Sequence, residues 1–405
     1  MNLPFFIAKR ISRKADGTFA ASIHRVAVVS IAVGLVSLLI AFMILGGYQQ
    51  KITEKIYSFS GELLISKYSL STSFEETSIM VDDTLLSQLK GTDYVSRWQY
   101  FGFKAGLLKT DEEVQGVIFK GVDTTFDTAF FATNMIEGRF PVLGTENYST
   151  EVAISKFMAN YLRLKVGDKV LIYFVQNPPR YRNLTIVGIY ETGLEDFDQK
   201  IIMGDLNLLR RINEWRPSEV GGVEVFLNPG NDVYASQDDL FQRIDADLYV
   251  ESVKDKYPNI FEWLALLDRN VVILLTLILV VACFSMISIL LILIMERAQM
   301  VGMLKAMGAD DGLMRRVFVY TGINLVLRGL GWGNLIGLAL GFIQYRYHLI
   351  PLDAANYYMN YVPINFDLNM IIGINVLMIA MISASLLVPV TILSRIQPVR
   401  AIRFD

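Results

Sequence analysis

The sequence predicts an integral membrane protein with four transmembrane helices and a large α+β domain between the first and second helix, a 1+3 arrangement. Only 19% of the 405 residues are charged and 53% are hydrophobic, whereas soluble domains are about one quarter charged. Four stretches are apolar over about 20 residues, which is enough to cross a bilayer. Residues 49–268 carry a net charge of −11 and the rest of the chain +8, so we expect one acidic, water-exposed domain.

The predicted spans cover 26–48, 269–295, 317–343 and 368–393. The first is longer than the 7–15 apolar residues of a signal peptide, and no small-residue cleavage site follows it. We therefore predict an uncleaved anchor. Residues 1–25 include Pro4–Lys14, where apolar side chains lie beside basic ones. This pattern is typical of an interfacial helix on the inner leaflet, with a disordered basic tail as the alternative.

The orientation of the spans follows from their basic flanks. These are Lys9, Arg10, Arg13, Lys14 and Arg25 before the first span, Arg297, Lys305, Arg315 and Arg316 in 296–316, and Arg395, Arg400 and Arg403 in 394–405. The 344–367 loop has only Arg346 against two aspartates. Because short cytoplasmic loops are rich in Lys and Arg, we predict cytoplasmic termini and a cytoplasmic 296–316 segment. The acidic domain and the 344–367 loop then lie outside.

Several kinds of site are excluded by composition. A single cysteine, Cys283, and two histidines, His24 and His348, provide neither a disulfide framework nor a zinc or histidine site. The chain contains no G-x-x-x-x-G-K-[ST] pattern, so it cannot hold ATP phosphates in a P-loop. Acidic pairs in the domain lack the spacing of a calcium loop and are predicted to be solvated. We predict no catalytic residue, metal or cofactor here, and no nucleic-acid binding.

The domain at 49–268 mixes strand-like and helical segments bounded by turn formers. Predicted strands are Gly61–Lys67, Glu113–Phe119, Glu151–Ile154, Lys169–Val175, Asn183–Tyr190 and Gly222–Leu227. Predicted helices are Asp82–Leu89, Ser155–Leu162, Leu206–Arg211 and Gln237–Leu248. Asn177, Pro178, Pro179 and Arg180 form a predicted hairpin tip, stiffened by proline.

The segment after the second span is the most informative part of the chain. Residues 295–309 read MERAQMVGMLKAMGA. This predicts a short cytoplasmic helix with Val301, Leu304 and Met307 on one apolar side, broken at Gly308, with Asp310 available to cap the next helix. An exposed apolar side requires a partner, so we predict a docking helix, with a connecting turn as the alternative.

Two features lie within the third span. Gly329, Gly333, Gly337 and Gly341 recur every four residues and allow close approach of another helix, from this chain or from a second membrane subunit. Arg328 lies about 18 Å along a helix from the Arg315–Arg316 anchor, where an unpaired arginine costs about 3 kcal/mol or more. Carbonyls, Asn324, lipid phosphate or a hydrated interface are its candidate partners, and simple snorkelling is the alternative.

The pattern E-R-x-x-x-x-G-M-L-K-A-M-G-A, beginning at Glu296, resembles the coupling segment of the FtsX-like ABC permease family. The C-terminal Ile396–Ile402 resembles the terminal signature of that family. Gly138–Phe140 and Leu162–Val170 resemble elements of a MacB-type periplasmic core domain. The outer loop, with Ile350-Pro-Leu-Asp and Val362-Pro363, looks most like the lipoprotein-releasing permeases of the LolC/LolE type.

This resemblance implies a permease subunit in the bacterial inner membrane that works with a separate ATPase, which holds ATP and Mg. The implied ATPase-coupling residues are Glu296, Arg297, Val301, Gly302, Leu304, Lys305, Met307 and Gly308. Further implied partners are a second permease copy or paralogue, a lipoprotein substrate and a periplasmic carrier. The carrier would dock near the Asn177–Arg180 hairpin, although this hairpin is shorter than a long carrier-binding hook.

Two other functions fit the same architecture. One is an export permease for another substrate, such as a peptide or lipid. The other is a signalling permease that controls an extracytoplasmic hydrolase, although regulators of that kind usually carry a smaller outer domain than 49–268. A membrane enzyme would need a catalytic set that the sequence lacks.

Overall fold

The computed structural model divides the chain into two compact units. It describes residues 4–7, 19–68, 77–110, 113–144, 147–176, 178–353 and 357–393. The helical unit comprises 1–50, 263–351 and 361–405, and the sheet unit comprises 51–262 and 352–360. Residues 4–7 are helical, but the rest of the predicted interfacial helix up to Lys14 and the C-terminal Ile396–Ile402 lie outside the described residues.

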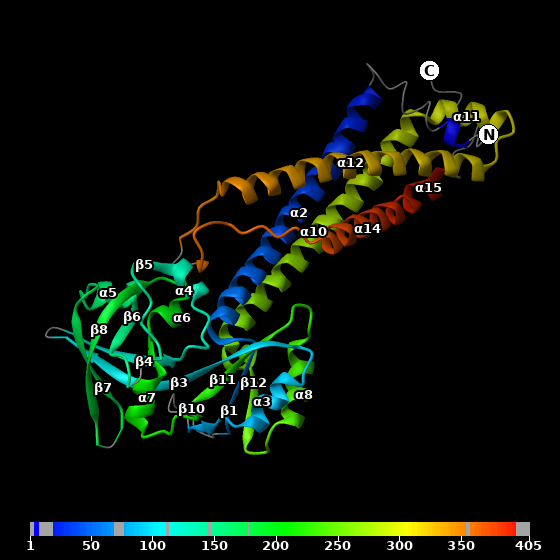
Figure 1. Ribbon diagram of the computed structural model, residues 1–405. Helices are drawn as coiled ribbons and strands as arrows, with labels where there is room; N and C mark the ends of the chain where they lie inside the picture. The colour runs from blue at the N-terminus through cyan, green and yellow to red at the C-terminus, as the bar shows by residue number, and fades with distance from the viewer. Residues whose placement is uncertain are drawn as a thin grey trace. The chain divides into compact units, whose positions relative to one another are not determined.

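Within the described part of the chain, four helical stretches are long and apolar enough to cross a membrane. They are α2 (Phe19–Ser60), α10 (Pro258–Glu296), α12 (Asp311–Tyr347), and α14 (Leu368–Ser385) continued by α15 (Leu387–Leu393), as labelled in Figure 1. The 39 residues of α10 extend about 58 Å, whereas a hydrocarbon core is about 30 Å thick. Both α2 and α10 therefore contribute residues to both units.

The outer end of α2 explains why this helix is longer than the predicted span. Ile52, Ile56 and Phe59 are fully buried in the sheet unit and recur at helical spacing, while Lys51 and Glu54 are exposed. This part of α2 is amphipathic rather than apolar all round. A search for uninterrupted apolar stretches consequently ends before it.

The helical unit has an apolar core shared by α2, α10, α12 and α14. Polar contacts also join these helices, for example between α12 and α14. Asn334 on α12 and Asn375 on α14 exchange two hydrogen bonds, with Nδ2 to Oδ1 distances of 2.7 and 3.0 Å. Paired amides between helices leave none of these donors facing lipid.

The sheet unit is built on a ten-stranded mixed sheet with the order β12-β1-β11-β3-β4-β9-β6-β8-β5, in which β7 pairs with both β3 and β8. Its strands are β1 (Leu63–Lys67), β3 (Val95–Lys109), β4 (Val114–Val122), β5 (Met135–Gly138), β6 (Glu151–Ser155), β7 (Lys169–Phe174), β8 (Arg180–Tyr190), β9 (Ile201–Asp205), β11 (Gly222–Leu227) and β12 (Leu248–Ser252). A separate small sheet pairs β2 (Ile79–Met80) with β10 (Glu219–Val220).

Six of these strands close into a ring, β3-β4-β9-β6-β8-β7, because β7 pairs back onto β3. The 15-residue β3 is the junction of the sheet. Its second half pairs with β7, and its first half pairs with β11, which leads to β1 and β12. Inside the ring the side chains pack tightly, since a Cβ on Gly204 would lie 2.3 Å from the ring of Phe119.

Short helices complete the sheet unit. They are α3 (Asp83–Lys90), α4 (Ala129–Asn134), α5 (Lys156–Tyr161), α6 (Glu195–Asp198), α7 (Leu206–Asn213), α8 (Val233–Arg243) and α9 (Val253–Lys256). Side-chain caps begin several of them, for example Asp82 accepting from Leu85 N at 2.8 Å. The α7 helix buries Leu206, Leu208, Leu209 and Ile212 in the sheet core.

The predicted strands are all present, with ends that differ by a few residues. The helix predicted at Gln237–Leu248 is partly wrong, since α8 begins at Val233 and ends at Arg243, and Leu248 starts β12. The longest strand, β3, was not predicted. Its residues include Gly102 and Gly106, and glycine in a strand weakens the propensity signal.

Candidate functional site

The segment between α10 and α12 forms a separate short helix, α11 (Ala298–Ala306). The first break falls at Arg297, and the second follows Met307, where Gly308 has a φ of +94° that favours glycine. The N–H groups of Gly308 and Ala309 donate to the carbonyls of Lys305 and Leu304, both at 3.0 Å. These bonds satisfy carbonyls at the end of α11.

The turn into α12 is fixed by two acidic residues. The Asp310 side chain caps α12 and accepts from Leu313 N at 3.2 Å, as the sequence predicts. Lys305 Nζ lies 2.9 Å from a carboxylate oxygen of Asp311. The ion pair links α11 to the first turn of α12.

The predicted apolar side of α11 needs a correction. Val301 and Gly302 are buried, and Leu304 packs against the core of the helical unit. These residues attach α11 to the spans because the helical core extends to its inner side. Met307, from the predicted set, is 82% exposed, and Met303, which lies outside that set, is 55% exposed.

The first two residues of the predicted coupling set differ in environment. Glu296 is exposed at the end of α10. Arg297 is half-buried, and its Nε has no hydrogen-bond partner among the described residues. Unpaired buried donors of this kind are uncommon. The guanidinium of Arg297 also places a positive charge at the end of α10.

The glycine stripe of α12 packs against α2 of the same chain. Added Cβ atoms on Gly329 and Gly333 would lie 2.7 Å from Ile31 Cβ and 3.0 Å from Leu35 Cβ. Gly337 and Gly341 face Leu39 and Met43 in the same way. The neighbour that the sequence left open is therefore within the chain.

Arg328 precedes this stripe and lies level with the beginning of the first predicted span. Its neighbour Gly329 contacts Val28 and Ile31 of α2. Arg328 also lines a cavity with His24 and Arg25. It therefore lies near one end of the spans, although it is 17 positions along α12 from Asp311.

The predicted hairpin tip lies between β7 and β8, which are antiparallel. Lys169 lies opposite Thr185, and Phe174 lies opposite Arg180. Asn177 lies outside the described residues. Arg180 points away from the tip, because its guanidinium donates to the Ile212 carbonyl at 2.7 Å and pairs with Glu214. Arg180 thus braces the hairpin against the end of α7.

Sequence reasoning missed a buried ionic cluster at the outer end of α2. Lys120 on β4 and Glu224 on β11 are fully buried, with 2.6 Å between Nζ and the carboxylate. Lys120 also donates to the Phe59 carbonyl in the last turn of α2, and Gln99 donates to Glu224 at 2.6 Å. A cation at a helix C-terminus is stabilising. The sequence hints at it only weakly, because Lys120 directly follows the predicted strand Glu113–Phe119.

A second lysine ties α2 to two loops of the sheet unit. Lys55 Nζ donates to the carbonyls of Thr192 and Tyr358, both at 2.7 Å. Close by, Asp198 accepts from the N–H of Gly193 and from the hydroxyl of Thr192, at 3.0 and 2.8 Å. Burial raises the pKa of the Asp198 carboxyl, and these hydrogen bonds partly oppose that rise.

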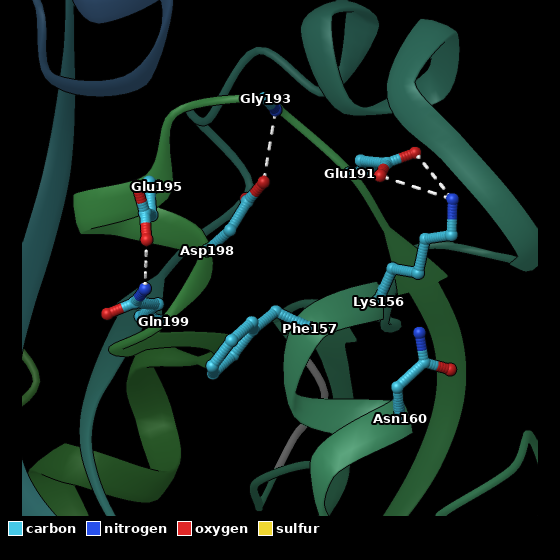
Figure 2. Close-up of a pocket in the computed structure, with 8 residues that line it drawn as sticks. All are labelled: Lys156, Phe157, Asn160, Glu191, Gly193, Glu195, Asp198 and Gln199. Atoms are coloured by element: carbon cyan, nitrogen blue, oxygen red, sulfur yellow. Dashed lines mark hydrogen bonds and ion pairs between the residues drawn. The ribbon is translucent and has the colours of Figure 1, made fainter. Parts of the chain in front are cut away.

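Figure 2 shows a cavity of about 330 Å³ beside this loop. Lys156 points to Glu191 across its rim, with 3.1 Å between Nζ and a carboxylate oxygen. Asp198 points towards Gly193, and Glu195 pairs with Gln199. Lys156 and Glu191 form an ion pair, and hydrogen bonds occupy the carboxylates of Asp198 and Glu195, so these residues support the loop.

Family models match both units of the chain. The model of the MacB-like periplasmic core domain matches residues 26–242, and that of the FtsX-like permease C-terminal region matches residues 272–398. The chain belongs to the FtsX-like ABC transporter permease family. The resemblance predicted from the coupling segment is confirmed, and the permease carries a MacB-like periplasmic domain between its first and second candidate membrane helices.

Curated relatives of this permease match it over most of its length. The lipoprotein-releasing system transmembrane protein LolC of Neisseria meningitidis is 22% identical over 97% of both chains. LolE of Haemophilus influenzae is 22% identical over 85% of this chain and 82% of the relative. Among solved structures, the periplasmic region of MacB from Actinobacillus actinomycetemcomitans is 12% identical with a TM-score of 0.34, covering 52% of this chain and 97% of that one.

Proposed function

We propose that this chain is the permease subunit of an ABC transporter that releases lipoproteins from the inner membrane to a periplasmic carrier. The observation that carries the proposal is the match to LolC, which covers 97% of both chains. The outer loop resembles the same group of permeases. A second permease copy or paralogue completes the membrane part of this transporter.

The proposed orientation follows the basic residues. Both termini and α11 lie in the cytoplasm, and the sheet unit lies in the periplasm, because Arg297, Lys305, Arg315 and Arg316 cluster around α11. ATP is hydrolysed on a separate subunit, since no P-loop pattern occurs in this sequence.

Coupling begins at α11 in this proposal. Met303 and Met307 face outwards, and methionine adapts its shape to a partner surface. Val301, Gly302 and Leu304 transmit the movement, because they are packed into the helical unit. The α2 and α10 helices then carry it on, since each is continuous through both units. At the outer end of α2, Lys55 and Lys120 attach the helix to the sheet unit.

The decisive experiment is depletion of this protein in its host, followed by separation of inner and outer membranes. We expect lipoproteins to accumulate in the inner membrane. The Met303→Glu/Met307→Glu variant should fail to restore sorting in the depleted cells. The same variant should capture the ATPase about tenfold or more weakly, as expected when interface anchors are lost. Met80→Glu is the matched control, because Met80 is an exposed methionine of the sheet unit.

Two outcomes would contradict different parts of this proposal. Normal lipoprotein sorting in a depleted cell without a duplicate permease would exclude lipoprotein release and favour export or signalling. Full ATPase capture by the double methionine variant would exclude α11 as the docking helix, whatever the substrate is.

A further inference from the structure

A second candidate site lies between α2 and α12. It is a cavity of about 530 Å³, within the range of small-molecule sites, about 300–1,000 Å³. Four polar residues, His24, Arg25, Ser37 and Arg328, and eight apolar residues line it. We propose that this cavity binds an anionic phospholipid, with the headgroup phosphate at Arg25 and Arg328 and an acyl chain along the apolar walls.

The charged end of the cavity favours an anion. His24, Arg25 and Arg328 lie together there. Neither arginine forms an ion pair or hydrogen bond with another residue in the stretches that the structure describes. Arg297 adds a further positive charge near His24, and Glu296 adds a negative charge there. Two guanidinium groups without a carboxylate partner match a phosphate, which each binds through paired N–H donors.

The other walls favour a lipid over a soluble anion. Eight of the twelve lining residues are apolar. From Leu325 to Ile336 the lining extends about 16 Å along α12, which is close to one leaflet, about half of a 30 Å hydrocarbon core. Trp332 is exposed at the cavity, as is typical of aromatic side chains near the lipid headgroups. A nucleotide or free phosphate would leave this apolar slot empty.

The position of the cavity separates this lipid from the lipoprotein substrate. Arg25 directly precedes the first span, and Gly329 holds Arg328 level with Val28. In the proposed orientation this end faces the cytoplasm, so the ligand is a lipid of the inner leaflet. The inference depends on insertion of α2 and α12 in the membrane and not on the identity of the transported substrate.

The test uses the purified full-length chain in detergent and native mass spectrometry with added phosphatidylglycerol or phosphatidylcholine of the same acyl chains. We expect tighter retention of phosphatidylglycerol. Arg25→Gln/Arg328→Gln should weaken it about 25-fold, since each basic residue near a membrane surface contributes about fivefold. Arg25→Lys/Arg328→Lys should retain most of the binding. Arg315→Gln/Arg316→Gln is the control, because both residues lie on α12 outside the cavity.

A third variant tests the apolar slot. Ile336→Trp should reduce retention of phosphatidylglycerol by filling the end of the cavity away from the arginines. Equal retention of the two lipids, or equal losses in the two double glutamine variants, would overturn the proposal. Displacement of the lipid by millimolar inorganic phosphate would also overturn it, because the site would then recognise phosphate alone.

Discussion

The two ends of α2 are held by different kinds of contact. In the helical unit, α2 packs closely against glycines of α12, such as Gly329 and Gly333. In the sheet unit, Lys55 of α2 donates to two loop carbonyls. Lys120 of β4 donates to a carbonyl in the last turn of α2 and to a buried carboxylate.

The difference follows from the solvent around each unit. Lipid tails provide little hydrophobic drive for helices to associate, so close backbone approach and dispersion must hold α2 to α12. A water-exposed domain gains its stability from an apolar core and can include a buried ion pair that fixes one geometry. We infer that the buried ion pair fixes the orientation of the end of α2 in the sheet unit. The glycines of α12 instead set how closely α2 approaches α12 in the helical unit.

The largest effect is expected from removing the positive charge of Lys120, which contacts the last turn of α2. Lys120→Met leaves Glu224 buried and unpaired, which costs about 3–5 kcal/mol. We expect the sheet unit of the purified protein to melt about 10 °C lower, since 1 kcal/mol shifts a unit of this size by about 2–4 °C. Near-ultraviolet circular dichroism during heating measures this change.

Two variants show whether charge is the cause. Lys120→Met/Glu224→Gln should recover most of the loss, because a neutral amide still accepts from Gln99. Lys200→Met removes an exposed pair with Asp196 and should cost less than about 1 kcal/mol. A full loss in the double variant would show that packing around Lys120, rather than the unpaired Glu224 charge, holds the end of α2.

Sequence patterns predicted the spans, the glycine stripe and the α11 helix because each depends on local composition or spacing. They did not predict which side of α11 is buried, since Val301 and Met307 are both apolar and only the packing of the helical core distinguishes them. The Lys120–Glu224 pair was also unpredictable. The two residues are 104 positions apart, and their contact depends on the sheet order that places β4 and β11 on either side of β3.

A smaller effect is expected at the inner contact. Gly329→Leu places side-chain atoms where Ile31 lies, with Cβ 2.7 Å from Ile31 Cβ, and overpacking of this kind costs about 1–3 kcal/mol. Gly331→Leu is a matched control two residues away, because nothing lies within 4 Å of a Cβ there. Thermal aggregation in detergent should begin at a lower temperature for the first variant only. Equal stability of the two variants would mean that α2 and α12 separate freely.

The last effect concerns pH at the junction of α2 and β1. Burial raises the pKa of Glu62 from its ordinary value of 4.5 to about 7, and burial also raises the pKa values of Glu251 and Asp198. A folded-state pKa above the unfolded value means that the folded protein holds the proton more tightly. Stability therefore falls as the pH rises from about 4.5 to 7.

Glu62→Gln should reduce this slope without removing it, because Glu251 and Asp198 still titrate. The measurement is the melting temperature of the sheet unit at several pH values in that window. Glu113→Gln is the control, since Glu113 is an exposed carboxyl of the same unit. An unchanged slope in Glu62→Gln would show that the Glu62 carboxyl is solvated in the folded protein.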